Sequence, residues 1–318
     1  PMRYLTARLG HLLAVLFFVT LLTFMLVNVL PGDIAYDIAG LDASEEDVQA
    51  IREDLGLNRP VILRYIEWLG GVLTGDWGHS YRTGEPVLEA IMSRFPVSLE
   101  LVIIAQIIAL LLAVPLGVIS ALRNNSRFDR VVAVTGFFCL SIPNFLMAII
   151  LIYIFGLWLH WLPVTGYEPI SEGLWDNVRN FILPSLSFAL AEWTVLTRVL
   201  RSDMIGVLQE DYISMARAKG MPVHRILWVH AMRPSSFSLI TLLGLQVGAL
   251  IGGSIIIESI FALPGVGRLL IGSIFARDFM IIQGCITLIA LAYVVINFTV
   301  DICYALLDPR IRTARAHG

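Results

Sequence analysis

The sequence predicts an all-α, polytopic membrane protein with six transmembrane helices. The first observation is composition: 57% of the 318 residues are hydrophobic and only 15% are charged, whereas soluble domains carry about 25% charged residues. The second is the length of the charge-free stretches, because a helix needs about 20 apolar residues to cross roughly 30 Å of hydrocarbon. The third is the position of the basic residues, which gather between these stretches on one predicted side.

Five of the six helices are predicted from stretches without a charged residue. They are Leu9–Gly32, Leu101–Leu122, Val131–Tyr167, Pro234–Ile257 and Phe279–Val300. The third stretch is longer than one crossing, and its helix is expected to end near His160. The sixth helix is predicted at Asn180–Leu200, which is apolar except for Glu192 and Arg198.

The basic residues orient these helices. Residues 31–96 hold 12 Asp and Glu against 5 Arg, while Arg residues precede the first helix, follow the second and follow the last. Because basic flanks stay in the cytoplasm, both termini are expected there. The expected organisation is a cytoplasmic end and first helix at 1–30, an external segment at 31–96, a core at 97–307 with a cytoplasmic loop at 201–233, and a tail at 308–318.

The external segment is expected to be ordered and helical. Ser44 can cap a helix, with Asp47 three residues later, and Gly56 can end that helix. Pro60 and Pro86 each suit the first position of another short helix.

The loop after the fourth helix reads as helix, turn, helix, with Gly220 and Pro222 at the break. It holds six basic residues: Arg198, Arg201, Arg217, Lys219, Arg225 and Arg233. A structured helical loop facing the cytoplasm indicates a docking surface, and the alternative is a solvated basic loop.

Small residues recur at every fourth position in two of the helices. The second helix has Ala105, Ala109, Ala113 and Gly117, and the fifth has Gly244, Gly248 and Gly252. Such ridges let helix backbones approach closely in lipid, either within the chain or against a partner subunit. Pro115 and Pro143 are expected to kink the second and third helices.

Several chemistries have no sequence signature here. The chain has no G-x-x-x-x-G-K-[ST] phosphate loop and no H-E-x-x-H motif, so ATP hydrolysis and metal binding are not expected in it. Cys139, Cys285 and Cys303 lie in apolar stretches and are expected to be buried and unpaired. The chain is therefore not expected to be an enzyme, and no nucleic acid partner is expected.

Motifs along the whole chain resemble one family. EDYISMARAKG (Glu210–Gly220) resembles the cytoplasmic coupling motif of type-1 ABC importer permeases, with Ser214-Met215-Ala216 where the superfamily has Glu-Ala-Ala. The matching stretches elsewhere are LPGDIA (Leu30–Ala35), DLGLNRP (Asp54–Pro60), GDWGHSYRTGEPV (Gly75–Val87), GGSIIIESIFALPGVGRLL (Gly252–Leu270) and LLDPRIR (Leu306–Arg312). The chain looks most like the dipeptide/oligopeptide/nickel branch, and there like the first, B-type, of its two permease subunits.

The resemblance implies a methionine-permease-like fold and a set of partners. These are a homologous second permease subunit, two ABC ATPase subunits that hold ATP and Mg, and a periplasmic or lipid-anchored solute-binding protein. The protein would be located in the bacterial inner membrane, and the transported solute would be a di- or oligopeptide or a similar small solute.

The resemblance also implies site residues. The coupling residues would be Glu210, Asp211, Tyr212, Ala216, Arg217, Ala218, Lys219 and Gly220. Glu192, Gln246 and Glu258 are candidates for the translocation path. Pro264, Gly265, Gly267 and Arg268 are candidates for an outer gate or a binding-protein contact, or for a plain surface turn.

Glu192 supports one alternative function. A carboxylate at the bilayer centre costs on the order of 3 kcal/mol, and such residues mark ion pathways. An ion-coupled secondary transporter that uses Glu192 is therefore the alternative to an ABC importer. A structural hydrogen bond to a neighbouring helix, or a neutral protonated acid, would also explain this residue.

Overall fold

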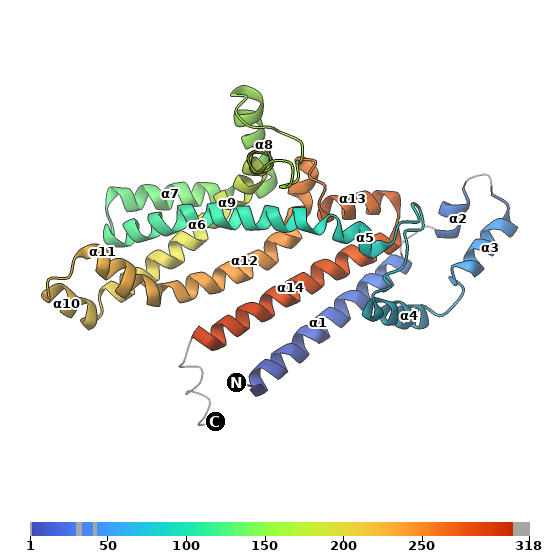
Figure 1. Cartoon of the computed structure of the whole chain (residues 1–318), viewed down its shortest axis with the longest axis horizontal. Coiled ribbons are helices and arrows are strands. Elements are labelled where there is room, and N and C mark those ends of the chain that lie inside the picture. Colours follow the sequence, from blue (N-terminus) through green and yellow to red (C-terminus); the bar gives the residue numbers. More distant parts are fainter. Residues whose placement is uncertain (1, 30–33, 41–42, 308–318) are drawn as a thin grey trace. The chain divides into compact units, whose positions relative to one another are not determined.

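The chain folds as a set of helices in a computed structural model (Figure 1) that describes residues 2–29, 34–40 and 43–307. The predicted tail 308–318, and the boundary between segments near residue 31, lie outside these residues. The only β pairing in the described part is an isolated bridge between His79 and Pro86. The predicted all-α class is confirmed.

Sixteen elements follow one another along the described residues. They are α1 (Met2–Val29), α2 (Ile34–Ala39), α3 (Glu45–Asp54), α4 (Val61–Thr74), α5 (Val87–Met92), α6 (Phe95–Leu122), α7 (Arg127–Ser141), α8 (Asn144–Leu151), the π-helix η1 (Ile152–Trp158), α9 (Leu174–Leu208), α10 (Asp211–Ala218), α11 (Val223–Arg225), the π-helix η2 (Ile226–Ala231), α12 (Met232–Ile260), α13 (Val266–Ala276) and α14 (Phe279–Leu307).

The elements form two compact units. Among the described residues, the first unit contains Leu99–Leu263 and 296–307, and the second contains those within Met2–Ser98 and Pro264–Val295. In the first unit α9 is central, because it packs against α7, α8 and α12. In the second unit α1 and α14 run side by side, and the Gln283 side-chain amide donates to the Thr20 carbonyl oxygen at 3.0 Å.

Four described stretches are long and apolar enough to cross a membrane: Leu9–Asn28, Val87–Leu122, Val223–Ile260 and Phe279–Ile302. α7 together with α8 and η1 adds a fifth if this bent pair is one span. The sixth predicted crossing forms a continuous 35-residue helix, α9, but α9 is too polar to pass the same test. The count of six therefore stays a prediction.

The expected helix signals in the segment before α6 are present. The Asp47 backbone N–H donates to the Ser44 hydroxyl at 3.2 Å, and the Ser44 N–H donates to the Asp47 carboxylate at 3.2 Å, which completes a capping box. Gly56 follows the end of α3 with a φ of +62°. Pro60 and Pro86 precede α4 and α5 as N-cap residues, one position before the place predicted for them.

Pro143 breaks the third predicted helix rather than kinking it gently. α7 ends at Ser141, α8 begins at Asn144, and the two halves of the stretch are bent by 102°. The last helical residue of this predicted stretch is Trp158 in η1, close to the predicted end near His160. Pro115 lies inside the continuous helix α6.

The small residues of α6 pack within the chain. Ala105, Ala109 and Ala113 have no exposed surface, and a Cβ added at Gly117 would lie 3.1 Å from the Leu200 side chain on α9. A threonine side chain on α9 adds to the contact, because the Thr197 hydroxyl donates to the Ala113 carbonyl oxygen at 3.5 Å. Of the two possibilities for this ridge, packing within the chain is confirmed.

Candidate functional site

Most of the predicted loop 201–233 is helical, and only short stretches of it lie outside helices. α9 continues to Leu208, and an almost unbroken helical run leads from Val223 into α12. Between them lies a segment that we call the elbow, residues 209–222, which contains α10. The elbow lies at the same end of its unit as the turn between α6 and α7 (Figure 1).

Gly220 ends α10 in the way its sequence position predicts. Its φ is +73°, in the left-handed region that favours glycine. The Gly220 N–H donates to the Arg217 carbonyl oxygen at 2.9 Å, and the Met221 N–H donates to that of Ala216 at 3.2 Å. This pair of bonds is a Schellman motif, which reverses the chain tightly after the helix.

A small hydrophobic cluster anchors the elbow to its own unit. Ile213, Ala216 and Ile226 are buried together, with Val207, Leu208 and Met221 packed against them. The Tyr212 hydroxyl reaches the His230 carbonyl oxygen at 3.5 Å. Burial, followed by the nearby Glu210 charge, raises the pKa of Tyr212, so this hydroxyl stays protonated and able to donate. α10 is thus held between the end of α9 and η2.

The opposite face of α10 is open to solvent. The exposed residues between positions 210 and 220 are Glu210, Asp211, Tyr212, Ser214, Met215, Arg217, Ala218, Lys219 and Gly220. Met215 is 59% exposed although it is a large hydrophobic side chain. Ala216 is different from the other predicted coupling residues: it faces inward and is buried, so its small size serves packing against α9 and η2 rather than an external contact.

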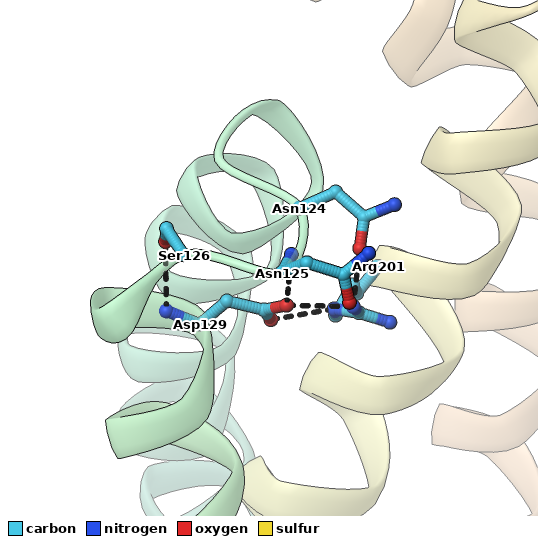
Figure 2. Close-up of polar contacts among 5 residues, drawn as sticks. All are labelled: Asn124, Asn125, Ser126, Asp129 and Arg201. Carbon is cyan, nitrogen blue, oxygen red and sulfur yellow. Dashed lines mark hydrogen bonds and ion pairs between the residues drawn. The ribbon is translucent and has the colours of Figure 1, made fainter.

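An ion pair joins α9 to the α6–α7 turn two helical turns before the elbow (Figure 2). Arg201 makes a bidentate contact with the Asp129 carboxylate, with Nε to Oδ1 at 2.6 Å and Nη2 to Oδ2 at 2.7 Å. Nη2 also donates to the Asn124 side-chain oxygen at 2.8 Å. Bidentate arginine–carboxylate pairs are strong and fix orientation. We call this arrangement the clamp, residues Arg201, Asp129 and Asn124.

The clamp is itself held in place by the start of α7. Ser126 caps that helix, and its hydroxyl accepts from the Asp129 N–H at 3.2 Å. The Asp129 carboxylate also accepts from the Asn125 N–H at 2.9 Å. The Asp129 carboxylate is buried despite its charge. Its three donors, Nε and Nη2 of Arg201 and the Asn125 N–H, replace the water that burial removes. The clamp thus links α9 to the α6–α7 turn and to the first turn of α7.

Glu192 lies inside the bundle with one amide partner. It is 9% exposed, and Gln106 on α6 donates to its carboxylate at 2.7 Å through Nε2. The oxygen of that amide, Gln106 Oε1, is buried, and no described residue forms a hydrogen bond with it. A hydrogen bond to a neighbouring helix, one of the explanations foreseen for Glu192, is therefore present.

The other two path candidates lie on α12. Glu258 is fully buried near the end of that helix. The Gln246 side-chain oxygen is buried without a hydrogen-bond partner among the described residues. The observed partner of Glu192 is Gln106, which the sequence analysis did not single out.

The predicted outer turn is the start of a helix. α13 begins at Val266, whose N–H donates to the Ser98 hydroxyl at 2.9 Å. Gly267 is buried, whereas Pro264, Gly265 and Arg268 line a cavity of about 540 Å³ in the second unit. Pro264 and Gly265 thus lie in the short connection between α12 and α13, and Gly267 and Arg268 lie in the first turn of α13. The sequence analysis did not predict α13, because it treated the stretch between the two long spans as a linker.

The sequence analysis also missed Asp129, Asn124 and Gln106. Asp129 had a signal, since Ser126 three residues earlier is the first half of a capping pattern. Gln106 had only its polarity inside an apolar helix. Neither residue could be paired with Arg201 or Glu192 from spacing, because 72 and 86 residues separate the partners.

Comparison with known proteins identifies the family. Residues 113–313 match the family described as binding-protein-dependent transport system inner membrane component, and residues 1–102 match the N-terminal part of such membrane components. The chain is 38% identical to the oligopeptide transport system permease protein AppB of Bacillus subtilis, over 97% of this chain and 98% of the relative. It is 38% identical to the glutathione transport system permease protein GsiC of Salmonella choleraesuis, over 98% and 99%.

A third relative is a Brucella abortus protein provisionally named as a peptide transport system permease, at 39% identity over 96% of this chain and 97% of the relative. The matches cover both compact units and the elbow between α9 and α12. The chain therefore belongs to the family of binding-protein-dependent transport system inner membrane components, as a multi-pass permease subunit of an ABC importer with the type-1 fold.

Proposed function

We propose that this permease subunit imports peptides or similar small solutes that an external binding protein delivers. The relatives named above carry peptides, oligopeptides or glutathione according to their names. In this proposal a second permease subunit completes the path, and two ATPase subunits bind ATP and Mg. Both termini and the elbow then face the cytoplasm, in agreement with the basic residues of the loop.

The observation that carries the proposal is the exposed face of α10. A short helix that is anchored on one side by Ile213, Ala216 and Ile226 can present its other side to a groove on an ATPase. Met215 supplies an apolar contact, and Arg217 and Lys219 can pair with acidic groups of the partner. The elbow would then receive the motion that ATP binding produces.

The clamp gives that motion a route into the membrane. A push on α10 moves the end of α9, and the bidentate contact of Arg201 with Asp129 carries the α6–α7 turn along. Rigid-body movement of helices past one another is a common way to alternate between two access states. We infer that α6, α7 and α9 move together during transport.

Gly220→Trp tests the coupling role. A tryptophan cannot adopt the left-handed φ of Gly220 without strain, and it would displace the exposed end of α10. We expect ATP-dependent peptide uptake in proteoliposomes to collapse, and co-purification of the ATPase subunits to weaken, while membrane insertion persists. Normal uptake would contradict the coupling role.

Gly70→Trp is the matched control for this test. Gly70 is exposed in the middle of α4, and among the described residues no atom lies within 4 Å of an added Cβ. It carries the same added side chain without a positive φ, so we expect uptake to stay near that of the unchanged protein.

We propose that Glu192 lies beside the translocation path, where Gln106 holds its carboxylate by a hydrogen bond. Glu192→Gln keeps the hydrogen-bonding shape and removes the charge, so it should change the preference for cationic over neutral peptides more than it changes assembly. Loss of the assembled complex would show instead that Glu192 only packs the bundle. The ion-coupled carrier finds no support in the relatives, and uptake that needs ATP after the proton gradient is dissipated would exclude it.

A further inference from the structure

The cavity of the second unit has walls of mixed charge. Its volume is about 540 Å³, within the range of pockets that hold small ligands. The charged residues that line it are Arg82, Arg94, Arg268, Glu85 and Asp278. The walls come from the loop before α5, the turn between α5 and α6, α13 with the two residues before it, and the start of α14 with the residue before it, all of which belong to one compact unit.

Asp278 lines this cavity, and one of its two carboxylate oxygens lacks a hydrogen bond among the described residues. The residue is 5% exposed, and its Oδ2 accepts a hydrogen bond from the Ser80 hydroxyl. Its other oxygen, Oδ1, is buried and has no hydrogen-bond partner in the part of the chain that the structure describes. Leaving a buried acceptor without a hydrogen bond is unfavourable, and more so when the group is charged. A ligand that donates to Oδ1 would remove this penalty.

Ser80 places Arg82 at a set position relative to Asp278. The Ser80 hydroxyl accepts from the N–H groups of Arg82 at 3.2 Å and Thr83 at 3.0 Å while it donates to Asp278. The Ser80 N–H also donates to the Glu85 carbonyl oxygen at 2.9 Å. The loop that carries Arg82 is therefore hydrogen-bonded to the Asp278 carboxylate, and both residues line the same cavity.

This arrangement selects a ligand with both signs of charge. A simple anion would meet the Asp278 carboxylate, and Ca²⁺ or Mg²⁺ would find a single buried carboxylate among arginines where several oxygens are needed. A primary ammonium group can donate to Asp278 Oδ1, and a carboxylate can accept a forked pair of bonds from Arg82. Amino acids and short peptides carry both groups.

We propose that this cavity binds the two charged ends of a short peptide, the ammonium on Asp278 and the carboxylate on Arg82. It is a solute-binding station of the permease itself, separate from the external binding protein. The proposal rests on the proposed function, because it assumes that peptides are the cargo.

The test measures direct binding of trialanine to the assembled transporter in nanodiscs, without the binding protein, by isothermal titration calorimetry. N-acetyl-trialanine lacks the ammonium group, and trialanine amide lacks the carboxylate. We expect the unchanged transporter to bind trialanine at least about tenfold more tightly than either capped peptide, as losing one charge-assisted hydrogen bond predicts.

Two variants assign the ends of the ligand. Asp278→Asn should weaken trialanine binding about tenfold and remove the preference over the N-acetyl peptide, while its amide oxygen still accepts from Ser80. Arg82→Gln should remove the preference over the amide instead, and its folding risk is small because the side chain is exposed. Arg59→Gln, at an exposed ion pair with Glu67 outside this cavity, should change neither preference.

Three results would overturn the inference. They are no saturable trialanine binding, preferences that both variants leave unchanged, and variants that weaken only the docking of the binding protein, which would make the cavity a protein contact. ATP-driven uptake of peptides in proteoliposomes separates the two proposals. Uptake with unchanged preferences rejects the station alone, whereas no ATP-driven uptake of any peptide rejects the proposed function.

Discussion

The packed centre of the helical bundle and the segment before α6 stabilise their helices by different means. In the bundle, α6 and α9 approach closely, since Ala109 and Ala113 are fully buried and Gly117 lies against Leu200. In the segment from α3 to α5, caps and hydrogen-bonded turns dominate, such as the capping box at Ser44 and the loop around Ser80.

The difference follows from the solvent. Between apolar helices in lipid, burial of hydrophobic surface provides little attraction, so contacts depend on close packing and on a few hydrogen bonds. Where water competes for every polar group, side chains that satisfy the helix ends keep short helices in place. The bundle should therefore be sensitive to added volume, and the segment from α3 to α5 to the loss of single polar groups and to pH.

The same four-residue spacing of small residues occurs at positions that are covered by a neighbouring helix and at positions that are open. The ridge on α12 begins with Gly244 against Val300, but no described atom lies within 4 Å of a Cβ added at Gly252. The four-residue spacing is the same as on α6. Spacing alone thus predicts that helices can approach, and only the packing shows which positions are covered.

The largest expected effect is overpacking on α6. Ala109→Leu adds three carbon atoms where no surface is exposed, and we expect a loss of about 3 kcal/mol of stability with little folded protein recovered. Gly252→Leu should change stability by about 1 kcal/mol or less, because its site is open. Fluorescence-detected size-exclusion thermal melting compares the two. Equal losses would break the distinction between covered and open ridge positions.

The next effect is expected at the clamp. Asp129→Asn leaves Arg201 without a carboxylate partner, and we expect a loss of about 2 kcal/mol, less than for a fully buried pair because Arg201 is partly exposed. A double-mutant cycle with Arg201→Gln measures the coupling between the two side chains. Additive losses would mean that the clamp stores no interaction energy and would remove its proposed part in joining α9 to the α6–α7 turn.

A smaller effect is expected in the loop that carries Arg82. Gly84 has a φ of +71°, so Gly84→Ala should cost about 1 kcal/mol of backbone strain. Hydrogen exchange of residues 78–86 should then become faster. Gly70→Ala, at a helical position of α4 with open space around it, should be neutral or slightly stabilising. The same increase in exchange for both variants would show that the loop does not depend on the conformation of Gly84.

The smallest effect concerns the α3 cap and depends on pH. Hydrogen bonds from the Ser44 side chain and backbone lower the pKa of Asp47. A lowered pKa in the folded state means that the contribution is complete above the ordinary aspartate value of about 3.9 and is lost as the pH falls through the lower folded value. The protection of the α3 amides, measured as the exchange rate relative to the intrinsic rate at each pH, should therefore decrease on acidification below about pH 4.

Ser44→Ala removes the cap at every pH, so its α3 should exchange faster near neutrality and respond less to acid. A cap variant with the same acid response as the unchanged protein would show that other carboxylates cause it. Such a result would weaken the claim that this segment depends on local polar contacts.

Local signals predicted local structure well. Ser44 with Asp47 and the glycines at 56 and 220 act as helix ends because a cap involves residues within a few positions of one another. The π-helical segments η1 and η2 were not foreseen, since no residue pattern distinguishes them from α-helix. α13 (Val266–Ala276) was not predicted, because the sequence analysis treated the residues between the two long spans as a turn and a linker.

The sequence by itself determined that the protein lies in a membrane, that it is helical and where the elbow lies. These features follow from composition, from the length of the charge-free stretches and from the turn at Gly220, which can all be recognised from residues close together in the chain. Only the tertiary structure decided which polar side chains meet. Glu192 with Gln106, Arg201 with Asp129, and Ser80 with Asp278 are pairs from distant parts of the chain. Such pairs depend on how helices pack, and packing is a property of the whole fold rather than of any one segment.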